Sequence, residues 1–181
     1  TGLYDESLRF NYYMQWVVMI LIVMGGLGYN IASNFIQYVK HFFYNLFNKN
    51  NKKFISRVIT LNTKIVIYTT ILLIVVGTGF FLISEQETFL SEHKTVFGKF
   101  TTAMFSSVTS RTAGFNTIDM SNFTVPGILF MIFLMWIGAS PASTGGGIKT
   151  TTFAIATLNI FSIARDKSNI EIGTRRVAKE S

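Results

Sequence analysis

Long uncharged apolar runs alternate with short polar stretches along this chain. Two of these runs, 16–36 and 65–83, approach the roughly 20 residues that a helix needs to cross about 30 Å of hydrocarbon. We therefore predict two membrane-spanning helices. Small residues let helices approach closely in lipid, so Gly25, Gly26 and Gly28 in the first run are interpreted as packing positions.

A shorter apolar segment follows the second run. Residues 96–109 have apolar side chains at helical spacing, but at 1.5 Å per residue a helix of this length rises only about 20 Å. We expect this segment to enter the membrane and turn back, as a re-entrant pore helix does. An interfacial amphipathic helix is the alternative.

The last apolar stretch is interrupted by glycines. Residues 125–137 and 153–164 are each about half a bilayer long, and "GASPASTGGGIKTTT" (138–152) separates them. Irregular backbone at membrane depth is tolerated only where it is buried in protein or lines a watery cavity. The sequence therefore predicts an all-α membrane protein, built from a helix, a re-entrant pore loop and a broken inner helix that carries a functional intramembrane loop.

Charge determines the topology. The 181 residues are 49% hydrophobic and 14% charged, they include no cysteine, and the net charge is +7. Lysine and arginine concentrate in two places, as cytoplasmic segments of membrane proteins do. The basic residues are Lys40, Lys49, Lys52, Lys53, Arg57 and Lys64 in the first cluster, and Arg165, Lys167, Arg175, Arg176 and Lys179 in the second. This distribution favours a multi-pass protein of the cell (inner) membrane, and no nucleic-acid partner is expected.

The same pattern divides the chain into four parts. Residues 1–37 carry the first span, 38–64 form a cytoplasmic connection, 65–164 carry the second span, the short helix and the broken helix, and 165–181 are a basic cytoplasmic tail. No signal peptide is recognisable at the start. We expect the chain to be a fragment of a longer protein.

The string "SRTAGFNT" (110–117) directly follows the short helix. The carboxyl end of a helix favours a cation, and backbone carbonyls that replace a hydration shell are the ligands of a potassium filter. Thr112, Ala113, Gly114 and Phe115 fit such a filter, and Gly114 supplies backbone freedom. A plain turn is the alternative. Arg111 is expected near the outer surface, paired with acidic residues or water.

The loop 138–152 resembles a phosphate loop only superficially, because Ile148 separates Gly147 from Lys149. We instead predict that it occludes a pore, with freedom from Gly145, Gly146 and Gly147 and a positive charge from Lys149. An ionisable residue within the membrane is a functional candidate by default. The alternative is that Lys149 extends to the cytoplasmic interface.

Nothing in the sequence favours an enzyme. It contains no metal-ligand spacing and no nucleophile with a neighbouring base, and we expect no cofactor, with potassium as a transported substrate. The leading hypothesis is potassium uptake through a carbonyl-lined filter that the glycine-rich loop gates. The alternative is a non-transporting membrane scaffold, in which the glycines only pack helices.

With these residues located, the chain resembles the Trk/Ktr/HKT superfamily of potassium transporters, specifically the membrane subunit of bacterial Trk and Ktr systems. "TSRTAGFNT" is similar to that family's third pore loop, and "GASPASTGGGIKTTTF" to the interrupted inner helix that follows it. "GGLGYN" is similar to the end of the second repeat's inner helix.

The resemblance implies four repeats around one pore, each contributing a filter glycine. It also implies a homodimer in membrane lipid, bound to a cytoplasmic nucleotide-binding regulatory subunit of the TrkA/KtrA type. The basic segments 38–64 and 165–181 are the expected contacts. On this view the chain holds the end of the second repeat and the whole third repeat.

Overall fold

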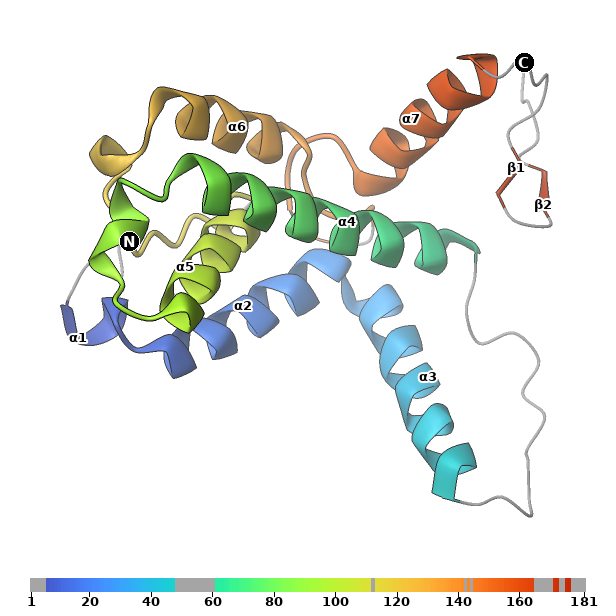
Figure 1. Ribbon diagram of the computed structural model, residues 1–181. Coiled ribbons are helices and arrows are strands. Elements are labelled where there is room, and N and C mark those ends of the chain that lie inside the picture. Colours follow the sequence, from blue (N-terminus) through green and yellow to red (C-terminus); the bar gives the residue numbers. More distant parts are fainter. Residues whose placement is uncertain are drawn as a thin grey trace.

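The computed structural model describes residues 6–47, 61–111, 113–141, 143, 145–164, 171–172 and 175–176, which are mainly helical (Figure 1). The elements are α1 (Glu6–Arg9), α2 (Tyr12–Leu27), α3 (Tyr29–Phe47), α4 (Leu61–Ser84), η1 (Phe89–Glu92), α5 (Val96–Thr109), η2 (Met120–Asn122), α6 (Val125–Trp136), α7 (Thr150–Ala164), β1 (Glu171–Ile172) and β2 (Arg175–Arg176). The two short strands pair antiparallel, with Glu171 opposite Arg176.

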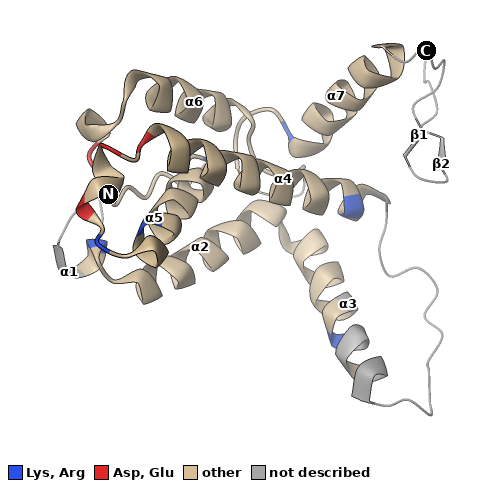
Figure 2. Ribbon diagram, in the orientation of Figure 1, with Lys and Arg blue, Asp and Glu red and all other residues tan. Residues whose placement is uncertain are grey.

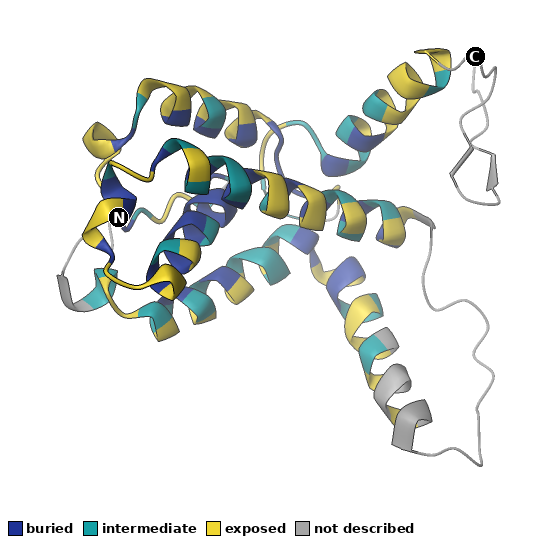
Figure 3. Cartoon of the chain, viewed as in Figure 1, coloured by how far each residue is buried: buried dark blue, intermediate teal, exposed yellow. Residues whose placement is uncertain are grey.

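The core forms around α5, which lies between α2 and α4 while α6 packs on α4 (Figure 1). Most of α5 is buried, whereas the outer faces of α4 and α6 are exposed (Figure 3). Phe81, Ala103 and Leu134 join α4, α5 and α6 in one apolar cluster. Met19 and Phe105 join α2 to α5 in a second cluster. A short helix is therefore enclosed by longer ones.

Helix α4 covers the predicted span 65–83. Among the described residues, Asn62–Ser84 is the one stretch that is long and apolar enough to cross a membrane as a single helix. Its side chains Tyr68, Leu72 and Val75 are largely exposed. Such a face suits lipid or the remaining parts of a larger membrane protein.

The segment predicted as one helix over 16–36 is divided between two helices, and its crossing of the membrane stays a prediction. The chain bends by 110° between α2 and α3, and Gly28 at the break has a φ of 75°. Residues with a Cβ rarely adopt this conformation. Among the described residues a Cβ added at Gly25 or Gly26 would meet nothing within 4 Å, so the close packing of these two glycines stays a prediction.

Helix α5 has the bounds predicted for the helix 96–109, and its role as a pore helix stays a prediction. Thr95 caps it, since its side chain accepts a hydrogen bond from the Gly98 amide at 3.1 Å. The broken helix is also present. However, α7 begins at Thr150 instead of 153, because the Thr150 amide bonds to the Ala139 carbonyl and the helix starts directly after that contact.

The charged residues are unevenly distributed among the described elements (Figure 2). Acidic segments gather near η1, at the end of the molecule where α4 finishes, and we refer to this as the outer end. Basic positions lie on α3 and at the start of α4 (Figure 2). Thr112, residues 48–60 of the connection and most of the tail 165–181 lie outside the described residues.

Candidate functional site

The turn after α5 is built around Gly114. Its φ is 72°, and its amide donates to the Thr109 carbonyl at 3.2 Å. Among the described residues a Cβ at this position would meet nothing within 4 Å. The positive φ by itself favours glycine here.

The remaining predicted filter residues lie on the same turn. Ala113 is half-buried, and the side chain of Phe115 is exposed. The Phe115 carbonyl accepts a hydrogen bond from the Thr109 hydroxyl at 2.5 Å. One acceptor site of this carbonyl is therefore already used by the pore helix, which fixes the direction of the turn.

Close contacts hold α5 in position. The Ser107 hydroxyl donates to the Ile74 carbonyl of α4 at 3.3 Å, and the Trp16 indole of α2 donates to the Thr101 hydroxyl at 3.3 Å. A Cβ at Gly77 would lie 2.2 Å from the Ser107 hydroxyl oxygen. The α4–α5 approach therefore depends on the absence of a side chain at Gly77.

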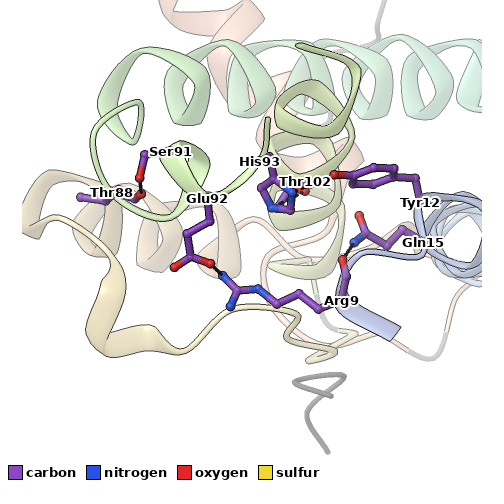
Figure 4. A network of polar contacts seen from close by, with 8 residues as sticks. All are labelled: Arg9, Tyr12, Gln15, Thr88, Ser91, Glu92, His93 and Thr102. Atoms are coloured by element: carbon purple, nitrogen blue, oxygen red, sulfur yellow. Dashed lines mark hydrogen bonds and ion pairs between the residues drawn. The ribbon is translucent and has the colours of Figure 1, made fainter. Parts of the chain in front are cut away.

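A polar cluster joins α1, α2, η1 and α5 at the outer end (Figure 4). Buried His93 contacts the Tyr12 hydroxyl through Nδ1 at 2.9 Å and the Thr102 hydroxyl through Nε2 at 3.2 Å. Beside it, Arg9 and Glu92 form an ion pair. Burial lowers the pKa of His93 below its ordinary value of 6.5, and the positive charge of Arg9 lowers that pKa further.

Glu85 is completely buried at the end of α4. Its carboxyl group accepts hydrogen bonds from the Thr124 amide at 3.2 Å and from the hydroxyls of Thr124 and Thr88 at 2.5 Å. Thr124 is the N-cap of α6, so Glu85 fixes the point where the chain returning from the filter turn enters α6. The sequence analysis assigned no role to this residue, and no local pattern distinguishes it from the neighbouring acidic residues.

The intramembrane loop runs from Ile137 to Lys149, and its two ends pair with each other. Ile137 and Ile148 form a parallel bridge. The Gly138 amide donates to the Ile148 carbonyl at 2.9 Å, and the Ile148 amide donates to the Trp136 carbonyl at 3.1 Å. The irregular backbone thus satisfies much of its own hydrogen bonding, as burial in a membrane requires.

Two glycines make this pairing possible. A Cβ at Gly138 would lie 1.7 Å from the Gly146 carbonyl oxygen, and Gly147 has a φ of 77°. Gly145 is half-buried, and its carbonyl accepts a hydrogen bond from the Lys149 ammonium at 2.7 Å. Lys149 is therefore bound within the loop and does not extend away from it.

The loop also closes the broken end of α2. The Ser140 amide donates to the Gly26 carbonyl at 3.0 Å, and the Ser140 hydroxyl donates to the Leu27 carbonyl at 2.6 Å. These α2 carbonyls have lost their helical partners at the Gly28 bend. The sequence offered no sign of this contact, because 113 residues separate Ser140 from Leu27.

Arg111 is not where the sequence analysis expected it. It lines a partly open cavity of about 20 Å³ with residues of α2, α4 and the loop between α6 and α7. Among the described residues, Nε of Arg111 has no hydrogen-bond partner. The one ion pair of the described residues joins Arg9 and Glu92 and does not include Arg111. Arg111 therefore lies among the helices, without an acidic partner among the described residues. Water as its partner stays a prediction.

The cavity brings the end of α5 next to the loop between α6 and α7, since Arg111 and Gly138 both line it. Within the described residues no group of three or more His, Cys, Asp or Glu side chains is arranged to hold a metal ion.

Comparisons with known proteins agree on one family. The family model described as "TrkH: Cation transport protein" matches residues 2–181. The chain is 35% identical over 158 residues to the Ktr system potassium uptake protein B of Vibrio alginolyticus, covering 87% of this chain and 32% of the relative. It is 34% identical over 180 residues to the Ktr system potassium uptake protein D of Bacillus subtilis, covering 98% and 37%.

The potassium/sodium uptake protein NtpJ of Enterococcus hirae is 31% identical over 167 residues, covering 92% of this chain and 34% of that protein. Among solved structures, the potassium transporter TrkH from Vibrio parahaemolyticus matches the fold with a TM-score of 0.59 at 18% identity, covering 90% of this chain and 33% of that one. The chain thus spans about a third of the length of these relatives.

Proposed function

Because the chain belongs to the TrkH family of cation transport proteins, which are membrane transporters and not enzymes, we propose that the full-length protein takes up potassium ions across the cell membrane. Three relatives are named for potassium uptake. The observation that carries the proposal is the turn of Gly114 at the end of a short, enclosed helix. Such a turn can present backbone carbonyls to a dehydrated cation.

In this proposal Thr112, Ala113, Gly114 and Phe115 supply one quarter of a filter that four repeats complete. The part of the chain that the structure describes contains one such turn at the end of a short helix, so ion selectivity would belong to the whole protein. Gly114 has the most specific role, because a side chain there strains a turn with positive φ by roughly 1–2 kcal/mol. That strain would displace the adjoining carbonyls.

We further propose that the intramembrane loop is the gate. Gly145, Gly146 and Gly147 provide the backbone freedom for it to move, and the ammonium of Lys149 opposes a cation below the filter. The pairing of the loop ends supports a defined closed position. In the alternative function, a membrane scaffold, the same loop would only fill space between helices.

The experiment is potassium-limited growth of transport-deficient bacteria that express the full-length protein. Wild type should restore growth, whereas failure to do so at normal expression contradicts the proposed function. Gly114→Ser should lower the preference for potassium over sodium in flux assays, and unchanged selectivity contradicts the filter assignment.

A three-glycine deletion of residues 145–147 tests the gate. It should raise uptake per folded molecule, and Lys149→Ala should raise it less. A fall to background with normal folding contradicts the gate.

The proposal also includes how the full-length protein assembles with a second copy and with a regulatory subunit. The full-length protein would form a homodimer in the inner membrane, with a cytoplasmic nucleotide-binding regulatory subunit contacting segments 38–64 and 165–181. Two relatives are named as components of a Ktr system, which supports a partner. Charge reversal of Lys40 and Lys64 should weaken co-purification of that subunit, and unchanged co-purification contradicts this contact.

A further inference from the structure

The cavity beside Arg111 is the meeting point of segments that are distant in the sequence. Gly26 of α2, Thr70 of α4 and Arg111 line it, together with Gly138 and Thr150 from the two ends of the intramembrane loop. It therefore touches the filter turn, the loop and the bend of α2 at once.

Two polar groups that line this cavity have no partner among the described residues. They are Nε of Arg111 and the hydroxyl oxygen of Thr150, and both atoms are buried. Thr150 as a whole is only 1% exposed. Leaving such a group unpaired costs about 1–3 kcal/mol, so the two groups together favour a shared polar ligand.

The size of the cavity limits that ligand. Its volume of about 20 Å³ exceeds the roughly 10–15 Å³ that one water molecule requires. Nε of arginine can only donate, whereas a threonine hydroxyl can donate or accept. A water molecule matches both, because it accepts from Nε and either donates to or accepts from the hydroxyl.

We propose that one buried water molecule bridges Arg111 and Thr150, and that this bridge couples the filter turn to the closed position of the intramembrane loop. Arg111 lies in the string that leads to Gly114. The Thr150 amide bonds to the Ala139 carbonyl at 3.2 Å, so Thr150 follows the base of the loop. The coupling rests on the proposed function, whereas the water site itself does not.

The mechanism follows from these attachments. Displacement of the loop base would carry the Thr150 hydroxyl away from the cavity and break the bridge. The guanidinium of Arg111 would then lose a partner in a region of low dielectric, where unpaired polar groups are costly. The filter turn and the closed loop therefore stabilise each other, and Arg111 and Thr150 act as positioning residues for both.

A double-mutant cycle in the full-length protein tests the coupling. Thr150→Val removes the hydroxyl with little change of shape, and Arg111→Met removes the donor. We expect each to raise potassium uptake per folded molecule about three- to tenfold, the range for one lost hydrogen bond. The double variant should not exceed the larger single effect, because both changes remove the same bridge. Multiplying effects would overturn the coupling.

Two further variants keep this test interpretable. Thr157→Val is the control for Thr150→Val, because it makes the same change on the same helix. The Thr157 hydroxyl donates to carbonyls within α7 at 2.9 and 3.0 Å, so its removal should leave uptake unchanged. If Arg111→Met fails to fold, Arg111→Lys retains the charge without the Nε donor and should be equally non-additive with Thr150→Val. Additive behaviour of this pair would also overturn the coupling.

A high-resolution structure of the full-length protein tests the water site independently of transport. Density for one water within hydrogen-bond distance of Arg111 Nε and the Thr150 hydroxyl would support it. A dry cavity, or a side chain from the rest of the protein in that position, would overturn it. A protein that contains the water but does not transport potassium would contradict the proposed function and leave the site intact.

Discussion

Gly138 allows the sharpest test of the gate. Gly138→Ala introduces a Cβ 1.7 Å from the Gly146 carbonyl oxygen and 2.9 Å from Gly147 Cα. Both contacts are with backbone, so no side chain can turn aside to relieve them. The ends of the loop must separate.

The magnitude follows from the contacts that separation breaks. The hydrogen bonds from the Gly138 amide to Ile148 and from the Ala139 amide to Gly146 contribute about 1 kcal/mol each. Residual overpacking adds about 1–3 kcal/mol, so the closed loop loses about 3–5 kcal/mol. At 1.4 kcal/mol per factor of ten, the balance between closed and displaced loop shifts by at least about 100-fold.

The assay is rubidium or potassium uptake into proteoliposomes, normalised to protein that elutes as a folded species. Gly79→Ala on α4 is the control for a glycine-to-alanine change outside the loop, because among the described residues a Cβ there would meet nothing within 4 Å. We expect uptake to rise in Gly138→Ala and to stay near wild type in Gly79→Ala. A folded Gly138→Ala protein with reduced uptake would refute the gate, and equal effects of the two substitutions would refute the role of the close contact.

Three further outcomes are expected in the full-length protein. Gly77→Ala should lower the thermal midpoint of unfolding, because its Cβ would lie 2.2 Å from the Ser107 hydroxyl oxygen of α5. Gly79→Ala should leave the midpoint unchanged, since among the described residues its Cβ would meet nothing within 4 Å. Equal midpoints of the two variants would contradict this. The pKa of His93 is lower in the folded state than in the unfolded state, so the unfolded state binds a proton first as the pH falls. The free energy of unfolding should therefore decrease by up to about 1.4 kcal/mol per pH unit below about pH 6.5. His93→Gln should remove that part of the pH dependence, and an unchanged slope would argue against it. Glu85→Gln should cost about 1–3 kcal/mol, because an amide nitrogen cannot accept from Thr124; an unchanged unfolding curve would contradict that.

The sequence predicted the elements whose ends are marked locally. Helix α5 has a capping threonine, and a run of hydroxyl residues and a glycine ends it. Pro126 marks the first turn of α6. Helix α4 is a long apolar run between polar segments. In each of these cases the hydrogen bonds that define the element lie within a few residues, where a pattern can reveal them.

The features that were missed depend on distant partners. Apolar residues continue through Gly28, so nothing local distinguishes a bent helix from a straight one. The role of Glu85 depends on its contact with Thr124. The position of Arg111 depends on the cavity that it lines. Both of these surroundings form only when the helices pack. The filter assignment of 112–115 and the gate assignment of 145–149 remain predictions.

The contact between Ser140 and the end of α2 has a consequence for biosynthesis. While the ribosome is still making the intervening chain, the Gly26 and Leu27 carbonyls lack their later partner. A nascent helix that continues through Gly28 would offer them the amides of Asn30 and Ile31 instead, and exposed carbonyls in lipid are costly. We therefore expect 16–36 to insert as a straight helix and to bend only when the translocon releases the loop that carries Ser140.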